Sequence, residues 1–324
     1  MVEEQVSLVD ETGTVIGTAP RSVMRRDNLL HAATAVVVRS SAGDIYLSRR
    51  TSTKDWAPGH WDAGAGGVIT FGEDPYVSAQ RELSEELGIT GVELRPLMTN
   101  LYADDTTRCF EHVFEATWDG PVVHQVDEVA EGRWASLDEL ARLLLDPTQP
   151  FVPDGRMLLE RAAAEGRGDY AQLRAFAGAL TAGVDFTVTR HGQVRSLAEA
   201  AALRGIEPRD LVKTMIIRVS ADDHRIVLVP GDAEIAWPKV RSLLGVNRLS
   251  MPDADTARTV TGYPRGTITP FGACTRLPVL ADASISGTIS LGAGAYGVGM
   301  TVAAEPVLTA LDAQVADLVN RPPA

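Results

Sequence analysis

Residues 67–89 read GVITFGEDPYVSAQRELSEELGI, and this stretch decides the fold of the first half of the chain. Asp74 can cap a helix that has Pro75 at its first position, and Gly88 is a suitable C-terminal stop. The apolar stripe expected on this helix consists of Val77, Leu83 and Leu87. The stretch therefore predicts a glycine-containing loop followed by one amphipathic helix.

Three carboxylates share one face of this predicted helix. Glu82, Glu85 and Glu86 lie at positions i, i+3 and i+4, where like charges destabilise a helix unless a cation compensates them. Hard divalent cations such as Mg²⁺ take oxygen ligands and are bound by carboxylates together with substrate phosphates. The pattern therefore predicts that a metal-activated water attacks a bound phosphate, with a carboxylate as the base.

The spacing Gly-x5-Glu-x7-Arg-Glu-U-x-Glu-Glu-x-Gly-U, with U aliphatic, is met at every fixed position from Gly67 to Ile89. This is the Nudix box, and the chain resembles Nudix hydrolases over roughly residues 5–150. The resemblance implies an α/β/α sandwich, hydrolysis of a nucleoside diphosphate linked to another group, and Mg²⁺ or Mn²⁺ as cofactor. It implies that Gly67 shapes the metal loop and that Arg81, on the substrate side, orients the glutamates. It also implies that three carboxylates bind the metal and act in catalysis: Glu82, Glu85 and Glu86.

The segments before the box resemble Nudix proteins related to isopentenyl-diphosphate isomerase, so isomerisation is an alternative. That family places a catalytic cysteine just before a histidine ahead of the box. Here Gly59 precedes His60, and the nearest cysteine, Cys109, follows the box, which argues against isomerisation. Candidate substrate contacts in these segments, which could equally be structural residues, are His31, His60, Trp56 and Trp61.

Lys213 lies between apolar neighbours where a predicted helical segment meets a strand, so its charge must reach water, an acid or a ligand. Residues 261–272 are rich in turn formers, and free backbone N–H groups there could hold a carbonyl oxygen or a phosphate. Residues 291–297 contain Gly-x-Gly-x-x-Gly, but a dinucleotide-binding turn must open a helix. Here residues 298–302 are typical of a strand, which excludes that interpretation.

These segments follow one another in the order typical of the YbaK/ProX family of aminoacyl-tRNA deacylases, and the chain resembles that family over roughly residues 172–320. The resemblance implies a mixed α+β domain that hydrolyses the ester joining a wrong amino acid to tRNA, without a metal. It implies Lys213 as the catalytic lysine near the scissile ester, with backbone amides near Gly266 holding the carbonyl oxygen. It also implies two further substrate-site glycines, Gly292 and Gly294. Candidate contacts to tRNA phosphates are Arg190, Arg195, Arg209, Arg241, Arg248 and Arg265.

Two non-catalytic alternatives stay open. The first half could be a Nudix module that senses a nucleotide and regulates the second half. Glu85 and Glu86 favour catalysis, because a sensor has no need of the base. The second half could bind an amino acid or tRNA without hydrolysing it, and Lys213 favours hydrolysis.

Composition bounds these interpretations. The chain has 324 residues, 45% apolar and 23% charged, as expected of two globular domains. Its 2 cysteines exclude a disulfide framework and suggest a reducing, cytoplasmic compartment. No secretory signal is expected, and no membrane partner, because no run of about 18 apolar residues occurs. Residues 1–150 hold 12 Lys and Arg against 25 Asp and Glu, so the whole net charge of −13 lies there. The second half of the chain has no net charge and could approach a polyanion without general repulsion.

We therefore expect an α/β protein with a Nudix domain at residues 1–150, a linker at 151–171 and a deacylase-like domain at 172–324. Predicted strands are residues 33–38, 45–48, 186–189, 214–219 and 226–229. Predicted helices are residues 137–145 with Ser136 as cap, 170–180, 197–203, 237–244, and 310–319 with Thr309 as cap.

Overall fold

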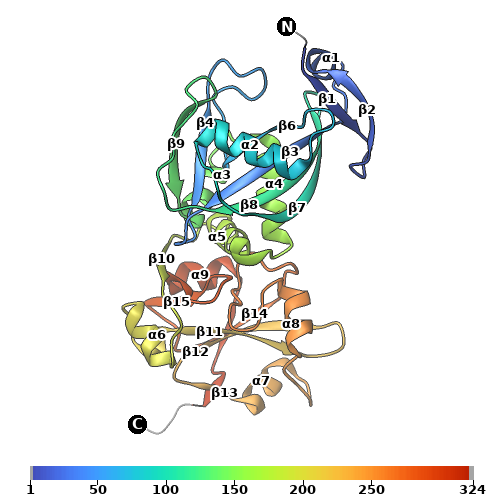
Figure 1. Ribbon diagram of the computed structural model, residues 1–324. Coiled ribbons are helices and arrows are strands. Elements are labelled where there is room, and N and C mark those ends of the chain that lie inside the picture. Colours follow the sequence, from blue (N-terminus) through green and yellow to red (C-terminus); the bar gives the residue numbers. More distant parts are fainter. Residues whose placement is uncertain (1–2, 321–324) are drawn as a thin grey trace. The chain divides into compact units, whose positions relative to one another are not determined.

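The computed structural model describes residues 3–320, which divide into two compact units between Ala162 and Ala163. Both units mix helices and strands, so the predicted α/β class is confirmed (Figure 1). The division falls within helix α4 (Pro153–Ala164), inside the segment predicted to be a linker. Pro153 occupies the first helical position, where proline costs no hydrogen bond, so its presence did not prevent a helix.

Within the described residues of the first unit, nine strands form one sheet. Its central strand β3 (His31–Arg39) pairs in parallel with β8 (Arg108–Thr117) and antiparallel with β6 (Ala65–Val68). The register places Thr34 opposite Gly67, which fixes the glycine loop to the middle of the sheet. The other strands are β1 (Gln5–Val9), β2 (Val15–Pro20), β4 (Ile45–Arg50), β5 (Trp61–Asp62), β7 (Leu94–Ala103) and β9 (Val129–Ala135).

Helices cover both faces of this sheet. Helix α2 (Pro75–Leu87) packs Leu83 into a core with Phe114 of β8. Glu111 lies on the opposite face of β8, because side chains alternate along a strand, and there it meets Asp154 of α4. The sheet therefore lies between helices, as the expected α/β/α sandwich requires. The remaining helices of the unit are α1 (Arg21–Arg26) and α3 (Leu137–Leu145).

Helix α2 begins and ends as the sequence predicts. The Asp74 carboxylate accepts from the Tyr76 backbone N–H at 2.9 Å, and Gly88 ends the helix at φ 65°. The predicted apolar stripe is partly wrong, because Val77 is 53% exposed while Leu83 is buried. Six residues at about 100° each turn Val77 about 120° away from Leu83, so only the leucines face the sheet.

The second unit consists of smaller sheets. One is formed by β10 (Phe186–Arg190), β16 (Val298–Ala303) and β15 (Thr288–Gly292). Another is formed by β11 (Val212–Arg218), β12 (His224–Pro230), β14 (Val279–Asp282) and β17 (Gln314–Ala316), and a short pair by β13 (Glu234–Ile235) and β18 (Val319–Asn320). A parallel bridge pairs Leu211, which directly precedes β11, with Ser290 in the middle of β15. The helices are η1 (Gly168–Tyr170), α5 (Ala171–Thr181), α6 (Leu197–Leu203), η2 (Pro208–Asp210), α7 (Trp237–Leu244), α8 (Ala254–Thr261) and α9 (Ala304–Ala310).

The predicted elements agree with the structure except at the end of the chain. Helices α3, α6 and α7 have the predicted bounds, and the five predicted strands correspond to β3, β4, β10, β11 and β12, with β11 ending one residue before the predicted end at 219. The predicted helix over residues 310–319 is wrong, and Thr309 lies inside α9 rather than at its start. Asp312 has a positive φ of 48°, which interrupts a helix, and β17 then pairs with β14. Long-range pairing and burial of Leu318 thus override local helix propensity.

Candidate functional site

In the first unit, helix α2 directs two glutamates at the glycine loop. The backbone N–H of Gly66 donates to Oε2 of Glu86 at 3.2 Å, and Glu86 is only 7% exposed. A Cβ atom added at Gly67 would lie 2.3 Å from Oε1 of Glu82, so the missing side chain makes the room that this carboxylate occupies. Glu85 lies farther out, with a half-exposed side chain. Glu82 and Glu86 thus lie against the glycine loop, and joint metal binding by all three glutamates stays a prediction.

Arg81 holds this group of carboxylates together. Its Nη1 donates to Glu82 at 2.8 Å and to Glu85 at 3.1 Å, and its Nε donates to Glu73 at 3.0 Å. Charge-assisted hydrogen bonds of this kind fix the rotamers of the acids. The contacts of Arg81 are to the glutamates of the box, in agreement with an orienting role.

The electrostatics of the group suit a divalent cation. Burial raises the pKa of Glu86 to about 7 and raises the pKa of Glu82, although Lys54 lies 3.5 Å from Glu86. One buried, one partly buried and one exposed carboxylate provide hard oxygen donors. The residues present therefore fit Mg²⁺ or Mn²⁺.

A second acidic cluster, on the other face of the sheet, was not predicted. Ligand atoms of Cys109, Glu111 and Asp154 lie within 4.8 Å of one another. They line a cavity of about 90 Å³ that also reaches Gly66, Gly67 and Asp62. Burial raises the pKa of Asp154 to about 7 and the pKa of the Glu111 carboxyl well above its usual value. Because side chains alternate along a strand, the sequence could have placed Cys109 and Glu111 on one face of β8. Asp154 could not be added to them, because it lies in the segment expected to be a linker.

The isomerase alternative gains nothing from this cavity. Burial and the nearby carboxylates raise the pKa of the Cys109 thiol, which disfavours the thiolate. His31 is buried, its Nδ1 lies 3.0 Å from the Leu29 carbonyl oxygen, and its pKa is lowered to about 4. The other three candidates also have protein partners. His60 lies 3.0 Å from the Pro58 carbonyl oxygen. The indole N–H groups of Trp56 and Trp61 donate to the side chains of Thr106 and Gln149.

In the second unit, Lys213 is half-buried on β11. Its Nζ donates to the carbonyl oxygens of Gly231 at 3.1 Å and Ala233 at 2.6 Å. Burial lowers its pKa, while the nearby acids Asp232 and Glu234 act in the opposite direction. An ammonium has three N–H donors, so one is left for a ligand.

The glycines predicted for this site lie on one pair of loops. Gly266 has φ 93°, which favours glycine, and Gly294 donates its N–H to the Thr267 carbonyl oxygen at 3.0 Å. A Cβ atom at Gly292 would lie 2.8 Å from the carbonyl oxygen of Ile268, so the loops touch where side chains are missing. Because Leu211 pairs with Ser290, Lys213 and Gly292, each two residues on, share one face. The bridge thus gives Lys213 and Gly292 a common face, and their meeting in one site stays a prediction.

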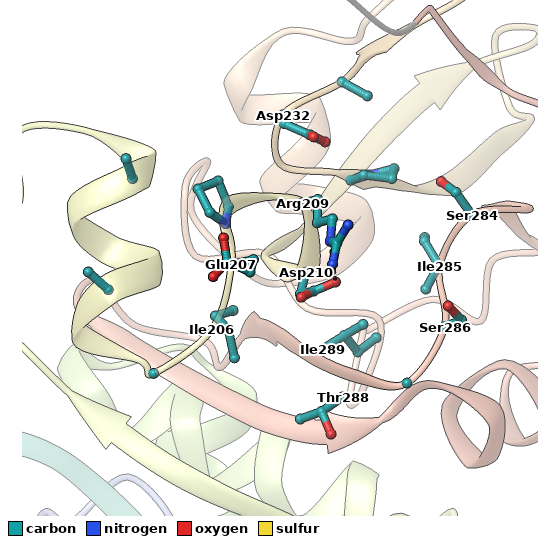
Figure 2. Close-up of a pocket in the computed structure, with 17 residues that line it drawn as sticks. Ile206, Glu207, Arg209, Asp210, Asp232, Ser284, Ile285, Ser286, Thr288 and Ile289 are labelled. Atoms are coloured by element: carbon teal, nitrogen blue, oxygen red, sulfur yellow. Dashed lines mark ion pairs between the residues drawn. The ribbon is translucent and has the colours of Figure 1, made fainter. Parts of the chain in front are cut away.

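A groove of about 1270 Å³ adjoins the turn that Lys213 supports. Figure 2 shows Asp232 at the top, Arg209 and Asp210 near the middle, and Ser284 and Ser286 at the right. Arg209 is 73% exposed and lies 3.8 Å from the Asp210 carboxylate. The groove is therefore open and polar, and only one of the predicted phosphate-binding arginines lies in it.

Comparisons with known proteins agree with this division. The Nudix domain family matches residues 29–154, and the aminoacyl-tRNA editing domain family matches residues 191–309. An uncharacterized Nudix hydrolase of Rhodococcus erythropolis is 44% identical over 167 residues, which is 48% of this chain and 90% of that protein. The uncharacterized Nudix hydrolase YfcD of Escherichia coli K12 is 41% identical over 151 residues, or 47% of this chain and 82% of that protein.

Among solved structures, the MutT protein of Methanosarcina mazei Go1 is 23% identical. It covers 43% of this chain and 96% of its own, with a TM-score of 0.37. Within residues 3–320, no helix combines the length and the apolar character needed to cross a membrane.

Proposed function

This chain belongs to the Nudix hydrolase family and carries an aminoacyl-tRNA editing domain, and from this premise we propose that it is a bifunctional hydrolase. The first activity is Mg²⁺-dependent hydrolysis of a nucleoside diphosphate linked to another group, with Mn²⁺ as a substitute. The second is metal-independent hydrolysis of misacylated aminoacyl-tRNA. The observation that supports the proposal is the placement of Glu82 and Glu86 of α2 against the glycine loop at Gly66 and Gly67.

In the first activity, Glu82, Glu85, Glu86 and the Gly67 carbonyl would hold the cation. A divalent cation bound there supplies a Lewis acid for the diphosphate and lowers the pKa of a water. Arg81 fixes the carboxylate rotamers, and Lys54 places a positive charge beside Glu86. A carboxylate of this group would accept the proton that the attacking water loses.

Substitution of Gly67 by alanine is expected to lower diphosphate hydrolysis about a hundredfold. The new Cβ atom would lie 2.3 Å from the Glu82 carboxylate, which can swing aside and preserve the fold but then leaves its place in the site. The measurement is kcat at saturating Mg²⁺, with thermal unfolding as a check of the fold. Gly17→Ala is the control, because a Cβ atom there meets nothing within 4 Å. Full activity of Gly67→Ala would contradict the metal-loop assignment.

In the second activity, the third N–H of Lys213 would bind an oxygen of the aminoacyl ester. Backbone N–H groups near Gly266 would stabilise the oxyanion that forms when water attacks the carbonyl carbon. The C–O bond to the ribose then breaks, which releases the free amino acid and the tRNA. None of these steps requires a metal.

We also propose that each activity belongs to a separately folding domain. A chain of residues 1–162 is expected to fold alone, whereas one of residues 1–150 loses α4 and its buried Leu158 and Leu159. Each buried leucine contributes about 1.5–3 kcal/mol, so the shorter chain loses much of a typical stability of about 5–15 kcal/mol. Urea unfolding of both chains measures this difference. Equal midpoints would place the boundary at 150.

The decisive experiment is a hydrolysis screen of the full chain. One arm offers nucleoside diphosphate derivatives with Mg²⁺ or a chelator, and the other offers a complete panel of misacylated tRNAs. Nucleotide binding without turnover would favour the sensing alternative for the first half. Binding of tRNA without release of amino acid would favour a binding module for the second.

A further inference from the structure

Arg204 directly follows helix α6, and its guanidinium lies over strands β15 and β16. Its Nη1 donates to Ser290 Oγ at 3.2 Å and to the Leu291 carbonyl oxygen at 3.5 Å. Its Nε and Nη2 lie 3.4 and 3.3 Å from Nε2 of His191. A Cβ atom at Gly299 would come within 2.6 Å of the guanidinium carbon, so the guanidinium occupies the space that a side chain at position 299 would fill.

This guanidinium has no acidic partner within residues 3–320 at ion-pair distance, and its contacts are a hydroxyl, a carbonyl and an imidazole. Arginine stays charged in proteins, and a charge that is largely withdrawn from water is costly unless an anion pairs with it. The Nε and Nη2 atoms form the edge that binds phosphate in a bidentate manner. In this structure, one imidazole nitrogen lies opposite that edge.

The guanidinium lies on the same face of the strands as the proposed ester site. Ser290, which it contacts, bridges Leu211, and Lys213 lies two residues farther along the same strand. Gly299, over which it lies, pairs with Gly292. Since paired residues and residues two apart face the same way, Arg204 and Lys213 present their cations on one surface.

We propose that Arg204, held in place by the buried Ser290, binds a backbone phosphate of the tRNA acceptor end beside the ester, with the phosphate replacing Nε2 of His191 at the Nε and Nη2 edge. The inference rests on the proposed deacylase function. The carboxyl group of an aminoacyl ester carries no charge, so the anions that such a substrate can offer here are its phosphodiesters. The second half of the chain has no net charge, so this contact depends on a local cation rather than on a general positive field.

The test compares two substrates that carry the same amino acid: a misacylated tRNA and the corresponding aminoacyl-adenosine, which has no phosphate. Arg204→Gln is expected to lower kcat/KM for the tRNA about 10- to 100-fold, mainly through KM, because a hydrogen bond to a charged group is lost. Hydrolysis of the aminoacyl-adenosine should not change. Lys239→Gln, which removes a charge on α7, should leave both rates unchanged. Arg204→Lys, which keeps the charge but not the fork, should lie between Arg204→Gln and the wild type.

Binding of uncharged tRNA, measured against salt concentration, separates the phosphate site from the chemistry. Arg204→Gln should weaken binding and lower the slope of log K against log salt by about 0.7–0.9, the share of one phosphate contact. Equal losses on both substrates would overturn the proposal, because Arg204 would then only position the loop. Unchanged tRNA binding and kcat/KM in Arg204→Gln would also overturn it. If the wild type binds tRNA through Arg204 but hydrolyses no ester, the phosphate site stands and the deacylase function fails.

Discussion

Replacement of Lys213 by alanine is expected to abolish deacylation of misacylated tRNA, with a loss of at least about a hundredfold in rate. The alanine removes the N–H that would contact the ester and also releases the carbonyls of Gly231 and Ala233, which bound the ammonium. Because the side chain is half-buried and the freed carbonyls can bind water, thermal stability should fall little. The measurement is amino acid release from Cys-, Ala-, Ser- and Pro-charged tRNAs, followed by the rest of a complete panel.

Two comparisons make the Lys213 result specific. Lys213→Arg should also be poor, because a planar fork does not replace a compact ammonium that contacts two carbonyls. A chelator should leave the wild-type rate unchanged. Full deacylation by Lys213→Ala, or no deacylation of any charged tRNA by the wild type, would remove the editing activity from the second unit.

Glu86→Gln is expected to lower diphosphate hydrolysis about a thousandfold, and Glu85→Gln by a comparable factor. The amide introduced by Glu86→Gln can still accept from the Gly66 N–H, so the loop keeps its hydrogen bond while the site loses one negative charge. A cation held by carboxylates binds more weakly for each charge removed. The measurement is the rate of phosphate-ester release from nucleoside diphosphate derivatives across a Mg²⁺ titration.

The control for these variants is Glu93→Gln, an exposed acid of the same unit that lies outside the site. It should keep full activity, which excludes a general effect of net charge. Chelation should abolish the wild-type activity, and added Mg²⁺ should restore it. If both glutamine variants stayed fully active, or if the chelator had no effect, the assignment of these glutamates as metal ligands would fail.

The parts of the site that lie within one short segment could be predicted from the sequence. Asp74, Gly88 and the three glutamates are tied to one another by the geometry of a single helix, which spacing alone encodes. Contacts between distant segments that no motif connects could not be predicted. Cys109 and Glu111 meet Asp154 only because α4 lies on the sheet.

For the same reason, the sequence does not single out Arg204 as a candidate binding residue. In the sequence it is one more arginine after a helix, and only the pairing of β15 with β16 places Gly299 beneath it. The C-terminal segment shows the converse error, because Gln314–Ala316 has helix-forming neighbours but pairs with β14. In this segment, pairing with a distant strand outweighs the local preference for a helix.

The close contact between the Arg204 guanidinium and Gly299 also constrains how this sequence can evolve. A Cβ atom at position 299 would lie 2.6 Å from the guanidinium, so even alanine at that position conflicts with arginine at 204. A side chain gained at 299 would displace the guanidinium, which is the flexible end of Arg204, and would cost its hydrogen bonds to Ser290 and Leu291. The two positions are therefore expected to be epistatic, although they lie 95 positions apart in the chain.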